Sequence, residues 1–222
     1  MKPLCFFLLA MVVCCSVSAQ KRNPKDRQIT SRYFNGTLFA KVNFASLLDP
    51  KSPTLQVGLE YRINEKLSAE FAVGIPIVAI AQHTVTDSTY HNYYKLRAEL
   101  HFFPKGRFFY IGPELLFMRK QQSKYSGNVR LKDAHDYNYT YAELEKMVFA
   151  FGIKVGMIVP LSEKLNIEGS FSLGPRIVNV KIDPVGLERR TGLFSGWVWP
   201  EKEGTTVGIH QAYGAKLSYT IF

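Results

Sequence analysis

Eleven charged side chains occupy alternate positions of otherwise apolar stretches, where chemistry or charge pairing would be concentrated. Six are bases and five are acids, namely Lys41, Arg62, Lys95, Arg97, Lys154 and Lys216 with Glu60, Glu70, Glu99, Glu114 and Glu168. Their near balance indicates an ion network, because charges removed from water are satisfied by pairing with one another. No HxH or HExxH spacing occurs among the histidines. We therefore expect no metal site and no cofactor.

A second group of reactive side chains lies between the apolar stretches. The serine, histidine and acid groups that could support hydrolysis of a lipid or peptide are Asp87, Ser88, His91, Asp133, His135 and Asp136. Nucleophilic catalysis needs a base within hydrogen-bonding distance of the nucleophile, and the spacing singles out no such pair. We therefore expect that the chain is not an enzyme, with a lipid-modifying hydrolase or acyltransferase as an alternative.

Aromatic residues and bases gather in the same intervening segments. The residues that could bind a ligand there are Tyr125, Tyr137, Tyr139, Tyr141, Arg189, Arg190, Trp197 and Trp199. Aromatic rings beside cations suit sugars and phosphorylated lipid headgroups, through stacking and charge-assisted hydrogen bonds. The alternative is a loop packed by its own aromatic residues.

The stretch Leu55–Ile75 indicates how these side chains are positioned. Apolar residues hold every second position in Leu55–Ile63 and Leu67–Ile75, and only three residues separate the two runs. That spacing predicts an antiparallel hairpin with one apolar face. The same pattern predicts eight strands in all, at Gly36–Leu47, Leu55–Ile63, Leu67–Ile75, Tyr94–Phe102, Phe109–Phe117, Met147–Val159, Leu165–Leu173 and from Thr205 to the end of the chain.

Short turns and long connections alternate between these strands. The long segments Pro76–Asn92, Arg119–Lys146 and Asp183–Gly204 are interpreted as irregular loops. Beyond Leu173 the alternation changes phase near Val178, which indicates a bulge. Strands of about 9–13 residues are long enough to cross a bilayer when tilted, and short turns at one end with long loops at the other are typical of outer-membrane barrels. We therefore expect an all-β fold, an eight-stranded antiparallel up-and-down transmembrane β-barrel.

The polar face carries glycine, alanine and serine between single charged residues, which suits the crowded axis of a narrow barrel. The apolar face would then meet lipid. Turning the strand of Arg62 the other way would place this side chain in hydrocarbon, at a cost of about 2–4 kcal/mol near the midplane. The alternative is a soluble periplasmic barrel of lipocalin type that binds an apolar ligand inside.

The first residues have the features of an export signal. Lys2 precedes an apolar run, Leu4–Val13, and the small residues Val17–Ala19 follow it. We therefore expect a signal peptide at 1–19, a flexible basic leader at 20–35 and the barrel at 36–222. All three cysteines lie within the signal, so the mature chain has no thiol chemistry.

Several short motifs carry a resemblance to a known family. They are Lys41–Asn43, Gly58–Arg62, Leu67–Glu70, Tyr110–Leu115 and the terminal Phe222. In these motifs the chain resembles small eight-stranded outer-membrane barrels of OmpA and OmpW type, and within them an uncharacterised family from Bacteroidota-type bacteria. The resemblance implies an outer-membrane location, contact with outer-membrane lipid and lipopolysaccharide, and Phe222 as the signal read by the outer-membrane assembly machinery.

The formal net charge of +10 does not indicate nucleic-acid binding. About half of the bases belong to the predicted ion network or to the leader, and an exported chain would not meet nucleic acid. We expect a monomer with an occluded, ion-paired lumen, which acts in envelope structure or in recognition through Tyr/Lys-rich outer loops.

Overall fold

The computed structural model describes residues 36–48, 54–76, 88–104, 108–131, 135–189 and 201–221, all within the unit Asn35–Phe222. The described residues are almost entirely β-strand, and the one helical element among them is a short 3₁₀ helix, η1 (Ala45–Leu48). None of the described helical residues forms a helix with the length and apolar character needed to span a membrane. The expected signal peptide and leader lie outside the described residues.

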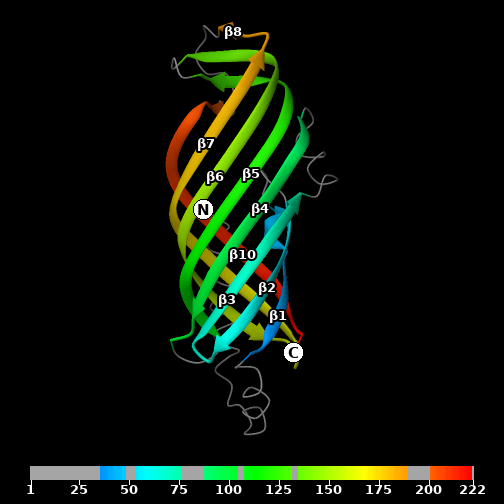
Figure 1. The fold of residues 1–222 in the computed structure, drawn as a ribbon, viewed down its shortest axis with the longest axis vertical. Helices are drawn as coiled ribbons and strands as arrows, with labels where there is room; N and C mark the ends of the chain where they lie inside the picture. Colours follow the sequence, from blue (N-terminus) through cyan, green and yellow to red (C-terminus); the bar gives the residue numbers. More distant parts are fainter. Residues whose placement is uncertain are drawn as a thin grey trace, which may run out of the picture. The chain divides into compact units, whose positions relative to one another are not determined.

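One sheet contains all the strands (Figure 1). They are β1 (Leu38–Asn43), β2 (Thr54–Asn64), β3 (Leu67–Pro76), β4 (Ser88–Phe102), β5 (Phe109–Arg130), β6 (Asp136–Pro160), β7 (Leu165–Val185), β8 (Glu188–Arg189), β9 (Glu201–Lys202) and β10 (Gly204–Thr220). Each long strand pairs antiparallel with its neighbours, and the pairing of β1 with β10 and of β5 with β6 closes a ring of eight. The predicted all-β, antiparallel arrangement is confirmed.

The hairpin β2–β3 forms where the alternation predicted it. Leu59 pairs with Phe71, and Glu60 pairs with Glu70, so apolar and charged residues keep to opposite faces across both strands. The turn is held by a 2.8 Å hydrogen bond from the Lys66 backbone N–H to Asn64 Oδ1. Both strands therefore place charged side chains inside the ring.

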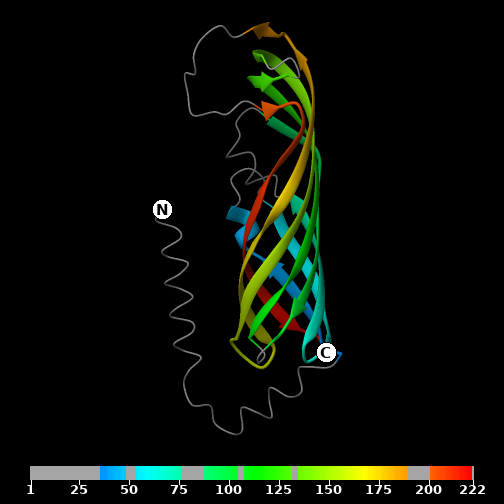
Figure 2. The ribbon, with the colours of Figure 1, turned by 90° about the vertical axis from the view of Figure 1, so that its left-hand side faces the viewer.

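The described residues of Arg119–Lys146 are almost all strand, so the prediction of an irregular loop is wrong. The pairing of β5 with β6 continues without a break from Arg119 and Met147 to Arg130 and Asp136. Figures 1 and 2 show that β5, β6 and β7 reach well beyond β1, β2 and β3. Within this segment the apolar residues change from the outer face of the sheet to the inner face. This change interrupts the alternation of apolar residues from which a strand is predicted.

Both faces of the long strands change polarity at the same level. On β6, Phe149, Phe151 and Ile153 are exposed on the outside of the ring, opposite an inner face that carries Lys154. Nearer the start of β6, Leu144 is buried inside, and the outer positions on either side of it hold glutamates. The ring is therefore apolar outside and charged inside at one end, and polar outside and apolar inside at the other.

The same change explains β7, which runs to Val185 without the predicted bulge. Its register with β10 is continuous from Gly204 and Val180 to Tyr219 and Leu165. Val178 and Val180 keep the inward phase of the strand and are buried there. They belong to a cluster that fills this end of the ring, made of Tyr93, Leu116, Met118, Val129, Tyr139, Ala142, Leu144, Val148, Ala150, Val178, Val180 and Ile182.

Candidate functional site

Four glutamates form one row across the inner face of consecutive strands. Glu60 of β2 pairs with Glu70 of β3, Glu70 with Glu99 of β4, and Glu99 with Glu114 of β5. All four are at most 4% exposed. Like charges directly opposite one another in a sheet are destabilising, and a buried charge needs a partner. The row is therefore stable only if cations reach it from elsewhere.

Lysines from the other half of the ring reach this row. Lys41 of β1 contacts Glu60 and Glu168 and lies 3.0 Å from Glu70. Lys216 of β10 lies 2.6 Å from Glu70 and 3.5 Å from Glu168. The contacts of Lys41 with Glu168 and of Lys216 with Glu70 join residues more than a hundred positions apart in the chain, so they link strands that are not neighbours in the ring.

The far end of the glutamate row has its own cations. Lys154 of β6 contacts Glu99 and lies 2.5 Å from Glu114. Lys216 Nζ is 3.1 Å from Glu99, and Arg97 Nε is 3.5 Å from Glu114. Each of these carboxylates thus has at least two cationic neighbours.

Aromatic side chains cover the end of the network near the short turns. The Arg62 guanidinium lies 3.6 Å from the centre of the Phe103 ring, a cation–π contact, while its Nη1 is 3.7 Å from Glu60. The Tyr110 hydroxyl donates a hydrogen bond to Glu168. Gly156 lies against the Tyr110 ring, and a Cβ on this glycine would collide with it. Residue 156 must therefore be glycine for Tyr110 to reach the network.

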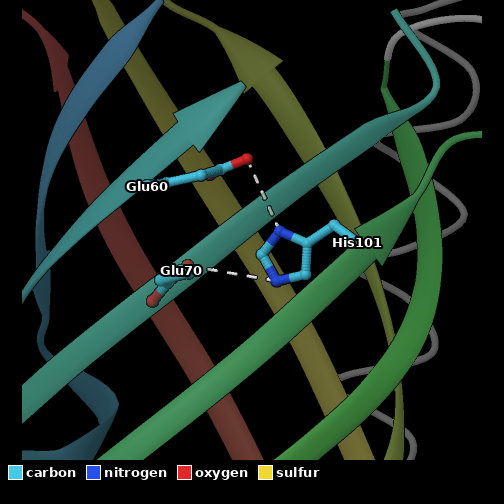
Figure 3. A group of neighbouring side chains, drawn as sticks. All are labelled: Glu60, Glu70 and His101. Carbon is cyan, nitrogen blue, oxygen red and sulfur yellow. Dashed lines mark ion pairs between the residues drawn. The ribbon is translucent and has the colours of Figure 1, made fainter. Parts of the chain in front are cut away.

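His101 lies in the middle of these groups. Its Nε2 is 2.8 Å from Glu99, and its ring stacks on Tyr110 with 4.0 Å between centroids. Figure 3 shows His101 between Glu60 and Glu70. Each of these three residues offers one ligand atom, and the three atoms lie within 4.8 Å of one another, close enough to hold a metal ion. Lys41 contacts both carboxylates, so an ammonium already provides the positive charge there. We assign these residues to the ion network.

The structure brings together all but one of the charged residues singled out in the sequence. Ten of the eleven are buried and linked by ion pairs, five bases with five acids. Lys95 is only half-buried. Sequence reasoning did not assign His101, Tyr110 and Phe103 to the network. The alternation in the sequence indicates that His101 and Tyr110 point inward. Which residues they contact depends on the register between strands, which the sequence does not show.

The chemistry that this arrangement supports is charge neutralisation. Every carboxylate of the network contacts a base, and the side chains are shielded from solvent. General acid–base catalysis requires a substrate within reach of the acid or base. The network therefore links strands around the ring through ion pairs.

The described candidates at the other end of the ring are separated into two environments. Tyr125 and Tyr141 are neighbours on the outer face, with ring centroids 5.5 Å apart. Tyr139 is buried in the apolar cluster, and Tyr137 packs against that cluster. Arg190, Trp197, Trp199 and Phe222 lie outside the described residues.

Two of the candidate catalytic residues are held by arginines. His135 lies 3.3 Å from Nη2 of Arg189. Asp136 accepts hydrogen bonds of 2.7 and 3.0 Å from Arg130, and these bonds raise the pKa of the Arg130 guanidinium. The side chains of Asp87, Ser88, His91 and Asp133 lie outside the described part of the structure. Arginines therefore hold His135 and Asp136 at the start of β6.

No protein-family model matches this chain, and no curated protein matches it.

Proposed function

We propose that this chain is an integral outer-membrane β-barrel that is closed by its ion network and serves envelope structure or recognition at its outer end. The contrast between the two faces of the ring carries the proposal. Leu59 and Phe71 are 51% and 53% exposed, whereas their neighbours Glu60 and Glu70 are 1% and 4% exposed. A soluble protein rarely exposes a continuous apolar surface, and a bilayer requires one.

The belt extends around the ring. Apolar side chains with at least 40% exposure lie on seven of the eight strands, namely Val57, Ile75, Leu100, Ile111, Phe151, Leu173 and Tyr213, and Phe44 directly follows the eighth strand, β1. A lipocalin-type barrel has the opposite polarity, with an apolar interior that binds the ligand. The buried ion pairs at this level leave an apolar ligand no suitable interior.

The change of polarity gives the limit of the hydrocarbon. Along the outer face of β5, Leu115 and Phe117 are followed by Arg119 and Gln121. The neighbouring positions on β6 change from Phe149 to Glu145. Outward-facing charges are costly at the centre of a bilayer and acceptable at its surface. This supports a membrane-crossing part that ends near Phe117, with the rest of β5, β6 and β7 in water.

The network also supports a closed interior. Lys154, Lys216 and Glu168 are at most 2% exposed, and an eight-stranded barrel has an interior just wide enough for side chains. The barrel would therefore not act as an open diffusion pore. Its surfaces for interaction would be the lipid-facing belt and the outer end.

Cell fractionation combined with gel mobility tests the proposal. We expect the protein in the outer-membrane fraction, soluble only with detergent, and with a different mobility in unboiled and boiled samples. Spin labels at Leu59 or Phe71 should report a lipid environment, whereas a label at Lys181 should report water. Extraction in plain buffer, or a water-exposed label at Leu59, would reject the membrane assignment.

A further inference from the structure

A second exposed apolar surface lies on the outer face at the far ends of β5, β6 and β7. We name it the tyrosine patch, and it consists of Tyr125, Tyr141 and Val185. Tyr125 pairs with Tyr141, and Tyr141 pairs with Val185, so the three residues share one face in adjacent strands. Tyr125 and Val185 are 55% and 61% exposed.

The tyrosine patch is separate from the proposed lipid-facing belt. Polar positions lie between them on each strand, such as Gln121 on β5, Glu145 on β6 and Lys181 on β7. From Phe117 to Tyr125 the strand advances by about 26 Å at the usual rise per residue. The apolar character of the patch is therefore not explained by contact with acyl chains, and it marks a second interaction surface.

Hydrogen-bonding groups fix and border the patch. The Tyr141 hydroxyl lies 3.2 Å from both Ser123 Oγ and Glu143 Oε1, which holds its ring in place. Glu143 pairs with Asp183 in the adjacent strand, and both carboxylates are exposed next to the patch. The surface thus combines a rigid pair of aromatic rings, tilted by 57°, with acceptors for hydroxyl groups.

We propose that the tyrosine patch binds a neutral glycan of the cell surface, an inference that rests on the proposed outer-membrane location. The apolar C–H face of a pyranose packs on tyrosine rings, and its hydroxyls donate to carboxylates such as Glu143 and Asp183. Those same carboxylates disfavour a phosphorylated headgroup, because like charges repel. A patch of three residues is also small for a stable protein interface, which buries about 800 Å² on each partner.

Calorimetric titration of the full chain in detergent tests this proposal. The probe is the lipid-free polysaccharide released by mild acid from the outer membrane of the producing bacterium. We expect binding by the unaltered protein and a loss of about tenfold or more in affinity for Tyr125→Ala, because one of the two stacking rings is removed. Tyr61→Ala, which removes a comparably exposed tyrosine of the belt, should leave the affinity unchanged.

The outcomes separate this proposal from the one on which it rests. Absence of binding, or equal affinity for the unaltered protein and Tyr125→Ala, would overturn the glycan site while heat-dependent mobility still supports the barrel. A protein partner that is captured by the unaltered chain and lost with Tyr125→Ala, in place of polysaccharide, would also overturn the glycan assignment. Loss of heat-dependent mobility in the unaltered chain would instead reject the membrane location.

Discussion

Replacing Lys41 with methionine should destabilise the ring strongly. Lys41 is 3% exposed and contacts Glu60, Glu70 and Glu168. Methionine has a similar length and fills the space, so the change chiefly removes the charge. The buried network would then hold four bases and five acids. Removing one partner of a buried ion pair costs about 3–5 kcal/mol, and we expect the upper part of this range because three carboxylates lose a neighbour.

Urea unfolding in detergent, followed by the change in gel mobility, measures this effect. A loss of about 3–5 kcal/mol is a large part of the stability of a typical domain. Lys181→Met is the matched control, since Lys181 is exposed on the outer face of β7, and its stability should change by less than about 0.5 kcal/mol. Adding Glu168→Gln to Lys41→Met rebalances the charges and should restore part of the loss. If Lys41→Met and Lys181→Met unfold at the same urea concentration, the network does not brace the ring.

Three further predictions concern the other parts of the structure. Gly156→Val should cost about 1–3 kcal/mol in urea unfolding, because the new side chain collides with Tyr110, and an unchanged midpoint would contradict that packing. Leu59→Arg should cost about 2–4 kcal/mol in lipid vesicles, whereas Gln121→Arg, beyond the proposed boundary, should cost little; equal losses would contradict the boundary. Leu144→Ala should cost about 2–5 kcal/mol locally and speed amide exchange in the ends of β5 and β6, while amides near Glu60 stay protected.

The inward side chains could be predicted from the sequence because a strand has a period of two. Once the apolar phase of Leu55–Ile63 is known, Glu60 and Arg62 must share the opposite face, whatever the neighbouring strands do. The partners could not be predicted in the same way. Lys41 meets Glu168 because the ring closes between β1 and β10, and no local pattern contains that closure.

The extension of β5 and β6 escaped prediction for a related reason. Local pattern reading assumed that apolar residues keep to one face of a strand throughout its length. In β6 they lie outside at Phe149 and inside at Leu144, so the alternation continues while its polarity reverses. The polarity of the two faces reverses while the backbone pairing stays regular. For this reason β7 keeps its register with β10 through Val178 and has no bulge there.

The reversal also constrains the environment more tightly than either face does alone. An apolar belt by itself could belong to an oligomer interface, and a buried ion network by itself could belong to a soluble core. In β5 and β6 the outer face becomes polar at the level where the inner face becomes apolar, near Phe117 and Phe149. A ring surrounded by water needs an apolar interior, whereas a ring surrounded by lipid tolerates charges in its interior. If the proposed membrane location is correct, one boundary between lipid and water accounts for both changes, and the spin labels at Leu59 and Lys181 test that boundary.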